Sequence, residues 1–386
     1  MSKTVFLHIG TAKTGTTALQ RFLPENSGIL NNLGFDHPIM PFHFPRMSDG
    51  RNAHFLTLWD DTSKYSSRWN KGFEVIRNDL SEYDNIILSD EVLWAECARE
   101  GFLERVCEGF SHLDARLKVI VYLRRQDEMA ESHWNQMVKG KLRLTEGFND
   151  FVKSGRYQES FPLDYGKGLD AISQYIEKEN IIVRAYEKQQ YKDGSLFSDF
   201  LDCVGLDLTR DYKLPEYVIN TRLPENVVEI KRWINMADSY RSDDVPNFYR
   251  EILKSSYSLD KKDDIPQSGE GRFSDEERSE FMASFKDSNS YVAREYLNRA
   301  DGRLFFEETK SLPKWSANFE SLLQDAVRVL AGADVYEYTK RRQLEHRVRE
   351  LETLTASLSD ALDEALDRIS QLESNNSGFI RRLRKK

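Results

Sequence analysis

The first half of the chain alternates short, almost wholly apolar runs with longer segments in which apolar residues recur every three or four positions. Runs that are apolar on both faces are typical of strands in a parallel sheet covered by helices on each side, and the longer segments are typical of amphipathic helices. This order predicts an α/β domain of three layers with a central parallel sheet. The predicted strands span residues 4–9, 85–89, 117–123 and 180–184, and the predicted helices include 16–33, 127–139 and 163–177.

The second half has a different pattern, because strand-like runs stop after Leu206 and helical periodicity follows. It predicts helices over residues 224–237, 275–285 and 289–297 and a loop over the polar, glycine-containing stretch 261–272. We therefore assign residues 1–330 to one α/β domain whose second half, from about residue 207, is helical.

From Tyr336 onward the apolar residues are spaced alternately four and three positions apart, with charged residues on the outer positions. This heptad pattern predicts a coiled coil over residues 336–374, formed with a second copy of the chain or with another helical partner. The pattern leaves the number of helices open, and a single solvated helix packed on the body is the alternative. The heptad positions are Leu344, Val348, Leu351, Thr355, Leu358, Leu362, Ala365, Ile369 and Leu372.

Composition narrows the class of protein without identifying it. The 386 residues are 39% hydrophobic and 31% charged, which excludes collagen-like and wholly disordered chains. The net charge of -9 argues against a nucleic-acid partner. Three scattered cysteines, Cys97, Cys107 and Cys203, argue against a disulfide framework. No apolar run approaches the ~18 residues of a membrane span, and no leader peptide is recognisable, so we expect a cytoplasmic protein.

The last twelve residues, 375–386, form a separate basic tail with five Lys or Arg and no acid. Residues 379–386 mix these cations with apolar side chains, a composition that suits anionic lipid at ~1 kcal/mol per basic residue. Such contact would place the protein peripherally at the inner face of a membrane. A solvated tail without a partner is the alternative.

The segment with the clearest chemistry lies between the first predicted strand and the first predicted helix. It reads Gly10-Thr11-Ala12-Lys13-Thr14-Gly15-Thr16-Thr17. A glycine-containing turn from strand to helix directs backbone N–H groups and the helix dipole toward one point, which suits an anion. Thr16 and Thr17 add hydroxyl donors, and Lys13 adds a cation. A glycine turn with an incidental lysine is the alternative.

The loop differs from the nucleotide-binding pattern G-x-x-x-x-G-K-[ST] in the position of its lysine. Gly10 and Gly15 have the required separation, but Thr16 follows Gly15 and the lysine, Lys13, lies inside the loop. No lysine is therefore placed to bridge β- and γ-phosphates in the usual way.

Residues 8–17 resemble the 5′-phosphosulfate loop of sulfotransferases that use 3′-phosphoadenosine 5′-phosphosulfate (PAPS), most closely the bacterial, carbohydrate-modifying type. The resemblance implies a P-loop-like fold and PAPS as the co-substrate. It also implies that residues 10–17 bind the 5′-phosphosulfate. In that family the lysine contacts the oxygen that bridges phosphate and sulfuryl group, so Lys13 would stabilise the leaving phosphate.

The resemblance also implies a second anion site, for the 3′-phosphate. Family members place an arginine at a strand end and a serine eight residues later, as Arg124 and Ser132 are placed here. A residue at a strand end and one two helical turns later can converge on one phosphate. Arg125 should point elsewhere. The alternative is that Arg124 pairs only with Asp127 or Glu128.

Further family-like segments extend the resemblance over about residues 4–306. The chain lacks the late Arg-Lys-Gly loop of the small-molecule branch, and the carbohydrate-type enzymes lack it as well. The resemblance therefore implies transfer to a hydroxyl of a sugar or glycan acceptor, as in polysaccharide biosynthesis. The family-like segments are 132–136, 183–187, 198–201, 274–278, 288–289 and 294–297.

Sulfuryl transfer needs a base for the acceptor proton, and two residues are candidates. Glu91 follows the second predicted strand, at the edge where open α/β sheets bind ligands. His54 lies on a predicted substrate-side helix or loop. Asp90 could cap the next helix and leave Glu91 free. Lys13, the loop amides and Arg124 can supply the electrostatic stabilisation, so we predict no essential metal.

Two other functions remain open at this stage. The first is a P-loop kinase of a small molecule, in which Asp90 at the end of strand 85–89 would hold Mg²⁺. The second is a non-catalytic scaffold, with a nucleotide-fold head on a coiled coil.

Overall fold

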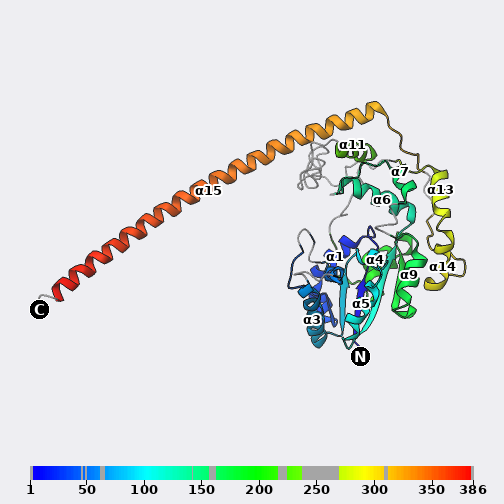
Figure 1. Cartoon of the computed structure of the whole chain (residues 1–386), viewed down its shortest axis with the longest axis horizontal. Helices are drawn as coiled ribbons and strands as arrows, with labels where there is room; N and C mark the ends of the chain where they lie inside the picture. Colours follow the sequence, from blue (N-terminus) through cyan, green and yellow to red (C-terminus); the bar gives the residue numbers. More distant parts are fainter. Residues whose placement is uncertain are drawn as a thin grey trace. The chain divides into compact units, whose positions relative to one another are not determined.

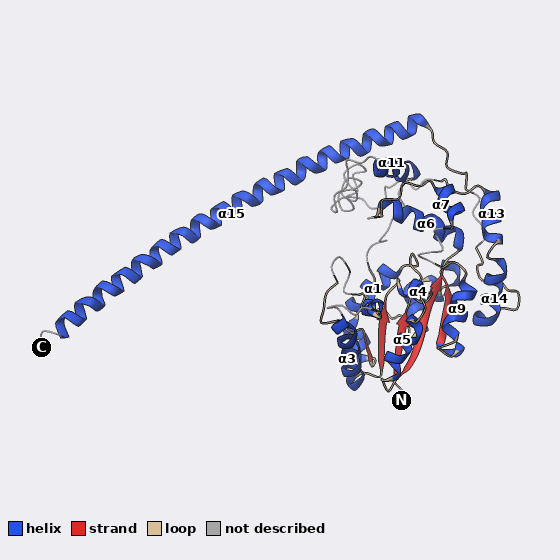
Figure 2. Ribbon diagram, in the orientation of Figure 1, coloured by secondary structure: helices blue, strands red, loops and turns tan. Residues whose placement is uncertain are grey.

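The structure is a computed structural model of the chain, and it describes residues 3–44, 47, 50–60, 66–140, 142–155, 162–215, 224–236, 269–307 and 312–383. Its centre is a five-stranded sheet in the order β2-β3-β1-β4-β5 (Figures 1 and 2). Every strand pair is parallel, so the carboxyl ends of all strands meet at one edge. The strands are β1 (Thr4–His8), β2 (Phe35–Asp36), β3 (Asn85–Ser89), β4 (Arg116–Leu123) and β5 (Ile181–Ala185).

The sheet confirms the predicted α/β class and contains the four predicted strands. Strand β2 was not predicted, because two residues are too few to show a pattern. Side chains alternate between the two faces, as β1 illustrates: Val5 and Leu7 enter one core and Phe6 enters the other. The pattern was apolar on both faces because both faces are covered.

Helices on both faces complete the three layers (Figure 2). The Val5 face is packed by α3 (Ser66–Glu82), α5 (Phe102–Ser111), α9 (Tyr165–Ser173) and α14 (Lys286–Leu297). The Phe6 face is packed by α1 (Thr16–Glu25), α2 (Ser27–Asn32) and α10 (Leu196–Cys203).

The helix predicted over residues 16–33 is in fact two helices separated by Asn26. Pro24 lies in the last turn of α1, where it has no N–H to donate, and the φ of Asn26 is −112°. The Asn26 side chain then donates to the carbonyls of Phe22 and Lys213 at 2.8 and 2.9 Å. The first bond satisfies a carbonyl in the last turn of α1, and the second ties the residue between the two helices to Lys213, which accounts for the break.

A third core joins four helices around Trp134, Phe148 and Phe273. Arg278 ties two of the helices together through buried ion pairs with Asp127 at 2.7 Å and Glu131 at 3.0 Å. The helices predicted over 224–237 and 275–285 belong here, with residue 237 outside the described residues. The four helices are α6 (Gln126–Lys139), α7 (Phe148–Ser154), α11 (Glu225–Met236) and α13 (Asp275–Ala283). The shorter helices of the fold are η1 (His54–Leu58), α4 (Leu93–Glu96), η2 (Lys178–Asn180), η3 (Lys188–Gln190) and η4 (Lys192–Gly194).

The predicted loop 261–272 lies partly outside the described residues. Its described end forms an isolated parallel bridge between Gly271 and Lys314.

The last helix, α15 (Phe319–Leu383), is 65 residues long and belongs to a compact unit separate from the one that holds the sheet. It runs across the predicted boundaries at residues 330, 336 and 374, which remain predictions. The side chains of the basic tail and residues 384–386 lie outside the described part, so its contact with anionic lipid also stays a prediction. Within the described residues, no helix has a stretch long and apolar enough to cross a bilayer.

Candidate active site

The loop between β1 and α1 lies at the carboxyl edge of the sheet and is bonded to β4. The N–H of Thr11 donates to the carbonyl of Tyr122 at 2.9 Å, and the N–H of Tyr122 donates to Gly10 at 2.7 Å. The hydroxyls of Thr11 and Thr14 also donate to backbone carbonyls, of Tyr122 and Thr11 respectively. Both hydroxyls therefore stabilise the shape of the loop, whereas no side chain caps the first turn of α1.

Both glycines of the loop are required by close packing as well as by backbone conformation. Gly10 and Gly15 have φ values of 106° and 74°. A Cβ on Gly10 would lie 2.8 Å from the carbonyl oxygen of Glu91, and one on Gly15 would lie 2.4 Å from Cδ2 of Leu196. The loop therefore packs between the carboxyl end of β3 and the first residue of α10.

Lys13 is the cation of this loop. Its φ of 66° is in the left-handed region. Burial lowers the pKa of its ammonium, the charge of Glu91 raises it, and the charge of Arg124 lowers it further. Two cations are therefore held close together in a partly desolvated place, an arrangement that an anion would stabilise.

Arg124 joins the end of β4 to this loop. Its Nη1 donates to the carbonyl of Lys13 at 3.0 Å, and its Nε donates to Glu128 at 2.9 Å. The pairing with Glu128 that the sequence left open is therefore present, but the Glu128 side chain is 41% exposed. Ser132 follows Glu128 by one turn of α6 and so lies on the same side of that helix. Arg125 points elsewhere, as predicted, and bonds Asp127 and the carbonyl of Glu307.

A second cluster of charges lies at the end of β3, centred on Asp90, which is fully buried. Its carboxylate accepts from Arg51 Nη2 at 2.7 Å, from His54 Nδ1 at 2.9 Å and from the N–H of Val92 at 2.9 Å. Burial raises the pKa of this carboxyl, but the bonds from His54 and Arg51 outweigh burial and leave the pKa below its usual range. Asp90 is therefore an anion. It accepts from the turn before α4 (Leu93–Glu96), but the N-cap residue of that helix is Val92 and no side chain caps it, unlike the cap that the sequence suggested.

His54 is placed beside Asp90 by its neighbour Asn52. The amide of Asn52 donates to the carbonyl of Ile87 at 3.0 Å and accepts from the N–H of Ser89 at 2.8 Å, which pins the start of η1 to β3. Because an ionised carboxylate can only accept, Nδ1 of His54 donates to Asp90 and Nε2 carries the lone pair. That nitrogen can accept a proton.

Glu91, the other candidate base, is not free. Its Oε2 accepts from Gln20 Nε2 at 3.0 Å, and its Oε1 lies 3.9 Å from Arg51 Nη1. Its side chain remains 23% exposed. Glu91 thus lies near enough to Lys13 for its charge to raise the pKa of the ammonium. His54 is held at the same edge of the sheet by its contact with Asp90.

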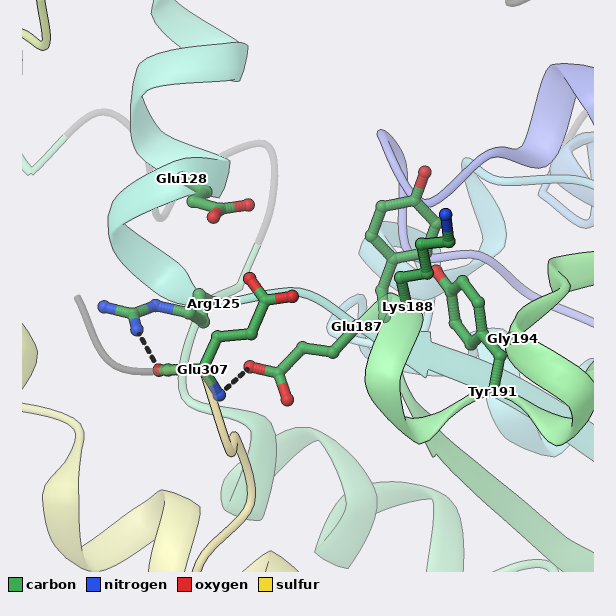
Figure 3. Close-up of a pocket in the computed structure, with 8 residues that line it drawn as sticks. Arg125, Glu128, Glu187, Lys188, Tyr191, Gly194 and Glu307 are labelled. Atoms are coloured by element: carbon green, nitrogen blue, oxygen red, sulfur yellow. Dashed lines mark hydrogen bonds between the residues drawn. The ribbon is translucent and has the colours of Figure 1, made fainter. Parts of the chain in front are cut away.

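A cavity of about 310 Å³ lies between the start of α6 and the segment that follows β5 (Figure 3). Tyr186 and Glu128 line it, and both contact Arg124; the guanidinium lies 5.7 Å from the centroid of the Tyr186 ring. One wall is tied together by Glu187 and Glu307, whose N–H donates to Glu187 at 3.1 Å. The other lining residues are Arg125, Lys188, Tyr191 and Gly194.

The sequence did not single out Arg51, Gln20 or Tyr186 as site residues. Tyr186 had a signal, because it lies two residues after the predicted strand 180–184 and within the family-like segment 183–187. Arg51 and Gln20 had none, because their partners Asp90 and Glu91 lie far away in the chain. Among the described residues, no three His, Cys, Asp or Glu side chains are grouped to hold a metal ion, and the predicted absence of an essential metal stays a prediction.

Comparison with known proteins gives weak similarities. No protein-family model matches the chain. An uncharacterised protein of Archaeoglobus fulgidus is 30% identical over 195 residues, which are 50% of this chain and 49% of that protein. The chain thus spans about half the length of this relative.

Two solved structures similar to this chain are both sulfotransferases. The enzyme from Alicyclobacillus acidocaldarius aligns with a TM-score of 0.38 and 16% identity, over 57% of this chain and 87% of that one. The sulfotransferase domain from the curacin biosynthetic pathway aligns with a TM-score of 0.34 and 14% identity, over 57% of this chain and 79% of that one. Similarities of this size say nothing about the substrate of this chain.

Proposed function

We propose that this protein is a PAPS-dependent sulfotransferase that transfers a sulfuryl group to a hydroxyl of a sugar or glycan. The observation that carries the proposal is the bond from Arg124 to the carbonyl of Lys13. It holds Arg124 against the loop, although the two residues lie 111 positions apart in the chain, beside a helix N-terminus that no side chain caps.

The residues at this place fit the two charged ends of the donor. The N–H groups of residues 12–17 and Lys13 would hold the 5′-phosphosulfate, and Arg124 with Ser132 would hold the 3′-phosphate. When bound, PAPS supplies an activated sulfuryl group. Glu128 is partly exposed, so its pairing with Arg124 is weak enough for a phosphate to replace it.

The cavity beside Arg124 would receive the nucleoside. Its volume of about 310 Å³ lies within the range of small-ligand pockets, and the Tyr186 ring gives it an aromatic wall. The same ring joins the cavity to the loop, because a Cβ on Gly15 would lie 3.4 Å from it.

We assign the general base to His54 and a positioning role to Asp90. The acceptor hydroxyl would give its proton to Nε2 of His54, and the positive imidazole would be stabilised by the buried Asp90 carboxylate. Lys13 would stabilise the negative charge that develops on the leaving phosphate. Glu91, which is bonded to Gln20, is the second candidate for the base.

The kinase alternative is disfavoured by the surroundings of Asp90. A carboxylate that binds Mg²⁺ needs free lone pairs, whereas this one accepts from Arg51, His54 and Val92 and is completely buried. The scaffold alternative has no positive support, because the cations and glycines of the loop are all present.

The test is calorimetric titration of 3′-phosphoadenosine 5′-phosphate, without metal, into the wild type and Arg124→Ala. We expect micromolar or tighter binding that weakens about 10- to 100-fold in the variant, the loss typical of a charge-assisted bond. Arg99→Ala, which removes an exposed arginine paired with Asp60, is the matched control and should bind normally. Binding of Mg-ATP alone would favour the kinase, and binding of neither would favour the scaffold.

A further inference from the structure

The long helix α15 carries an apolar stripe that is open to solvent in the single chain. Leu344, Val348, Leu351, Leu358 and Leu362 are between 48% and 63% exposed. With Thr355 between Leu351 and Leu358, they are spaced alternately four and three residues apart, so they follow one line along the helix when it supercoils to the left. An exposed apolar line of this length is typical of a surface that pairs with another helix.

We propose that α15 forms a parallel, in-register, two-stranded coiled coil with a second copy of this chain. With Val348 at a heptad a position, the a positions are Val348, Thr355, Leu362 and Ile369, and four of the five d positions are leucine. β-Branched residues at a combined with leucine at d favour two strands over three or four. The hydroxyl of Thr355 donates to the carbonyl of Leu351 at 2.7 Å, so this polar group is already satisfied at the seam.

The direction of pairing follows from the charges that flank the stripe. Over residues 338–368 every charged g position is basic (Lys340, Arg347, Arg368), and every charged e position is Glu (Glu345, Glu352). In a parallel pair each g residue faces the e residue five positions later on its partner. Lys340 would then face Glu345, and Arg347 would face Glu352, each on the opposite chain.

An antiparallel pair would set like charges against each other. Centred on Leu358, it would bring Arg347 of one chain beside Arg368 of the other, because g positions then face g positions. The present partners of these side chains do not prevent a rearrangement. Arg347 pairs with Glu350 and Glu345 with Arg341 within one exposed helix, and such pairs contribute little.

The mass of the full chain in solution tests the number of strands. By light scattering or sedimentation we expect twice the 45.0 kDa of one chain for the wild type. Leu351→Glu combined with Leu358→Glu, which buries two charges in the seam, should give the single-chain mass. The matched control, Thr353→Glu with Ser357→Glu, adds the same charge on the outer face and should keep the double mass. A single-chain or triple mass for the wild type would overturn the proposal.

Cross-linking and charge reversal test the direction. Val348→Cys should form a disulfide between the two chains under mild oxidation, with the wild type as the control for its native cysteines. In an antiparallel pair centred on Leu358 these two residues would be about 30 Å apart at 1.5 Å per residue, so a double mass without cross-linking would overturn the parallel arrangement. Lys340→Glu with Arg347→Glu should weaken the dimer, and adding Glu345→Lys with Glu352→Lys should restore it. Failure of that restoration, with helicity retained, would contradict the pairing.

Discussion

Two charged clusters lie side by side at the carboxyl edge of the sheet, and they are built in opposite ways. In the loop cluster, Lys13 and Arg124 are neighbours of like charge, and the carboxylate bonded to Arg124, that of Glu128, is 41% exposed. In the Asp90 cluster, the carboxylate is fully buried and accepts from both Arg51 and His54.

The difference lies in how exposed the carboxylates are. The cations of the loop cluster have partly exposed neighbours, Glu91 and Glu128, which a bound anion could replace, since an anion would also relieve the repulsion between Lys13 and Arg124. A buried carboxylate with all its donors in place is suited instead to fix the orientation of one imidazole.

Removing the base should have the largest effect. We expect His54→Gln to lower kcat/KM by about 10²- to 10⁴-fold, because proton transfer from the acceptor then has no side chain to receive it. Glu91→Gln, which keeps a group that can bond Gln20, should lower it much less. The measurement is transfer from labelled PAPS to the best acceptor of a sugar panel. A larger loss of kcat/KM in Glu91→Gln than in His54→Gln would identify Glu91 as the base and contradict the role assigned to His54.

Removing the loop cation should come next. We expect Lys13→Met to lower kcat by about 10²- to 10³-fold, the usual loss when one stabilising charge is removed from a transition state. The control is Lys118→Met, which removes a partly buried lysine from early in β4, where it lies 5.8 Å from the Phe6 ring. An equal loss in both variants would mean that Lys13 acts through the fold and not through the leaving group.

The contact between the loop and Arg124 could be predicted from the sequence, whereas the contacts that join His54 and Arg51 to Asp90 could not. The glycines and Lys13 lie within eight residues, and Arg124 ends a plainly apolar run, so the parallel sheet alone brings them to one edge. His54 meets Asp90 only because Asn52 bonds the backbone of β3, a contact across 35 residues that no local pattern encodes. The break at Asn26 was missed for the same reason, since its partner Lys213 lies 187 residues away.

The ion pair of Arg51 with the buried Asp90 should contribute more to stability than an exposed ion pair with the same N–O distance. Arg51 and Asp90 approach to 2.7 Å, as do Arg99 and Asp60 on the surface. We expect Asp90→Asn to lower the free energy of unfolding by about 3 kcal/mol, because it leaves Arg51, whose side chain is only 14% exposed, without its main counter-charge. Asp60→Asn should cost less than about 1 kcal/mol. Denaturant unfolding measures both, and equal losses would refute the contrast in burial.

The smallest effect per pH unit concerns His8, which lies in the core and is bonded through Nδ1 to Ser89 Oγ at 2.9 Å. Burial lowers its pKa to about 4, with the charge of Asp90 opposing burial. Below pH 6.5 the unfolded chain binds a proton here and the folded chain does not, so the free energy of unfolding must fall as the pH drops from 6.5 to 4. One such histidine contributes at most about 1.4 kcal/mol per pH unit to that slope.

The contribution of His8 is measured by how steeply the free energy of unfolding changes with pH, and not by its value at one pH. His8→Gln has no imidazole to titrate, so its free energy of unfolding should fall less steeply between pH 6.5 and 4 than that of the wild type, whatever the variant costs at neutral pH. His37 and His133, whose pKa values burial also lowers to about 4, keep their share of the slope in both proteins. Urea unfolding at a series of pH values measures the difference. If the free energy of unfolding falls equally steeply with pH in both proteins, His8 is accessible to water and is not desolvated in the folded chain.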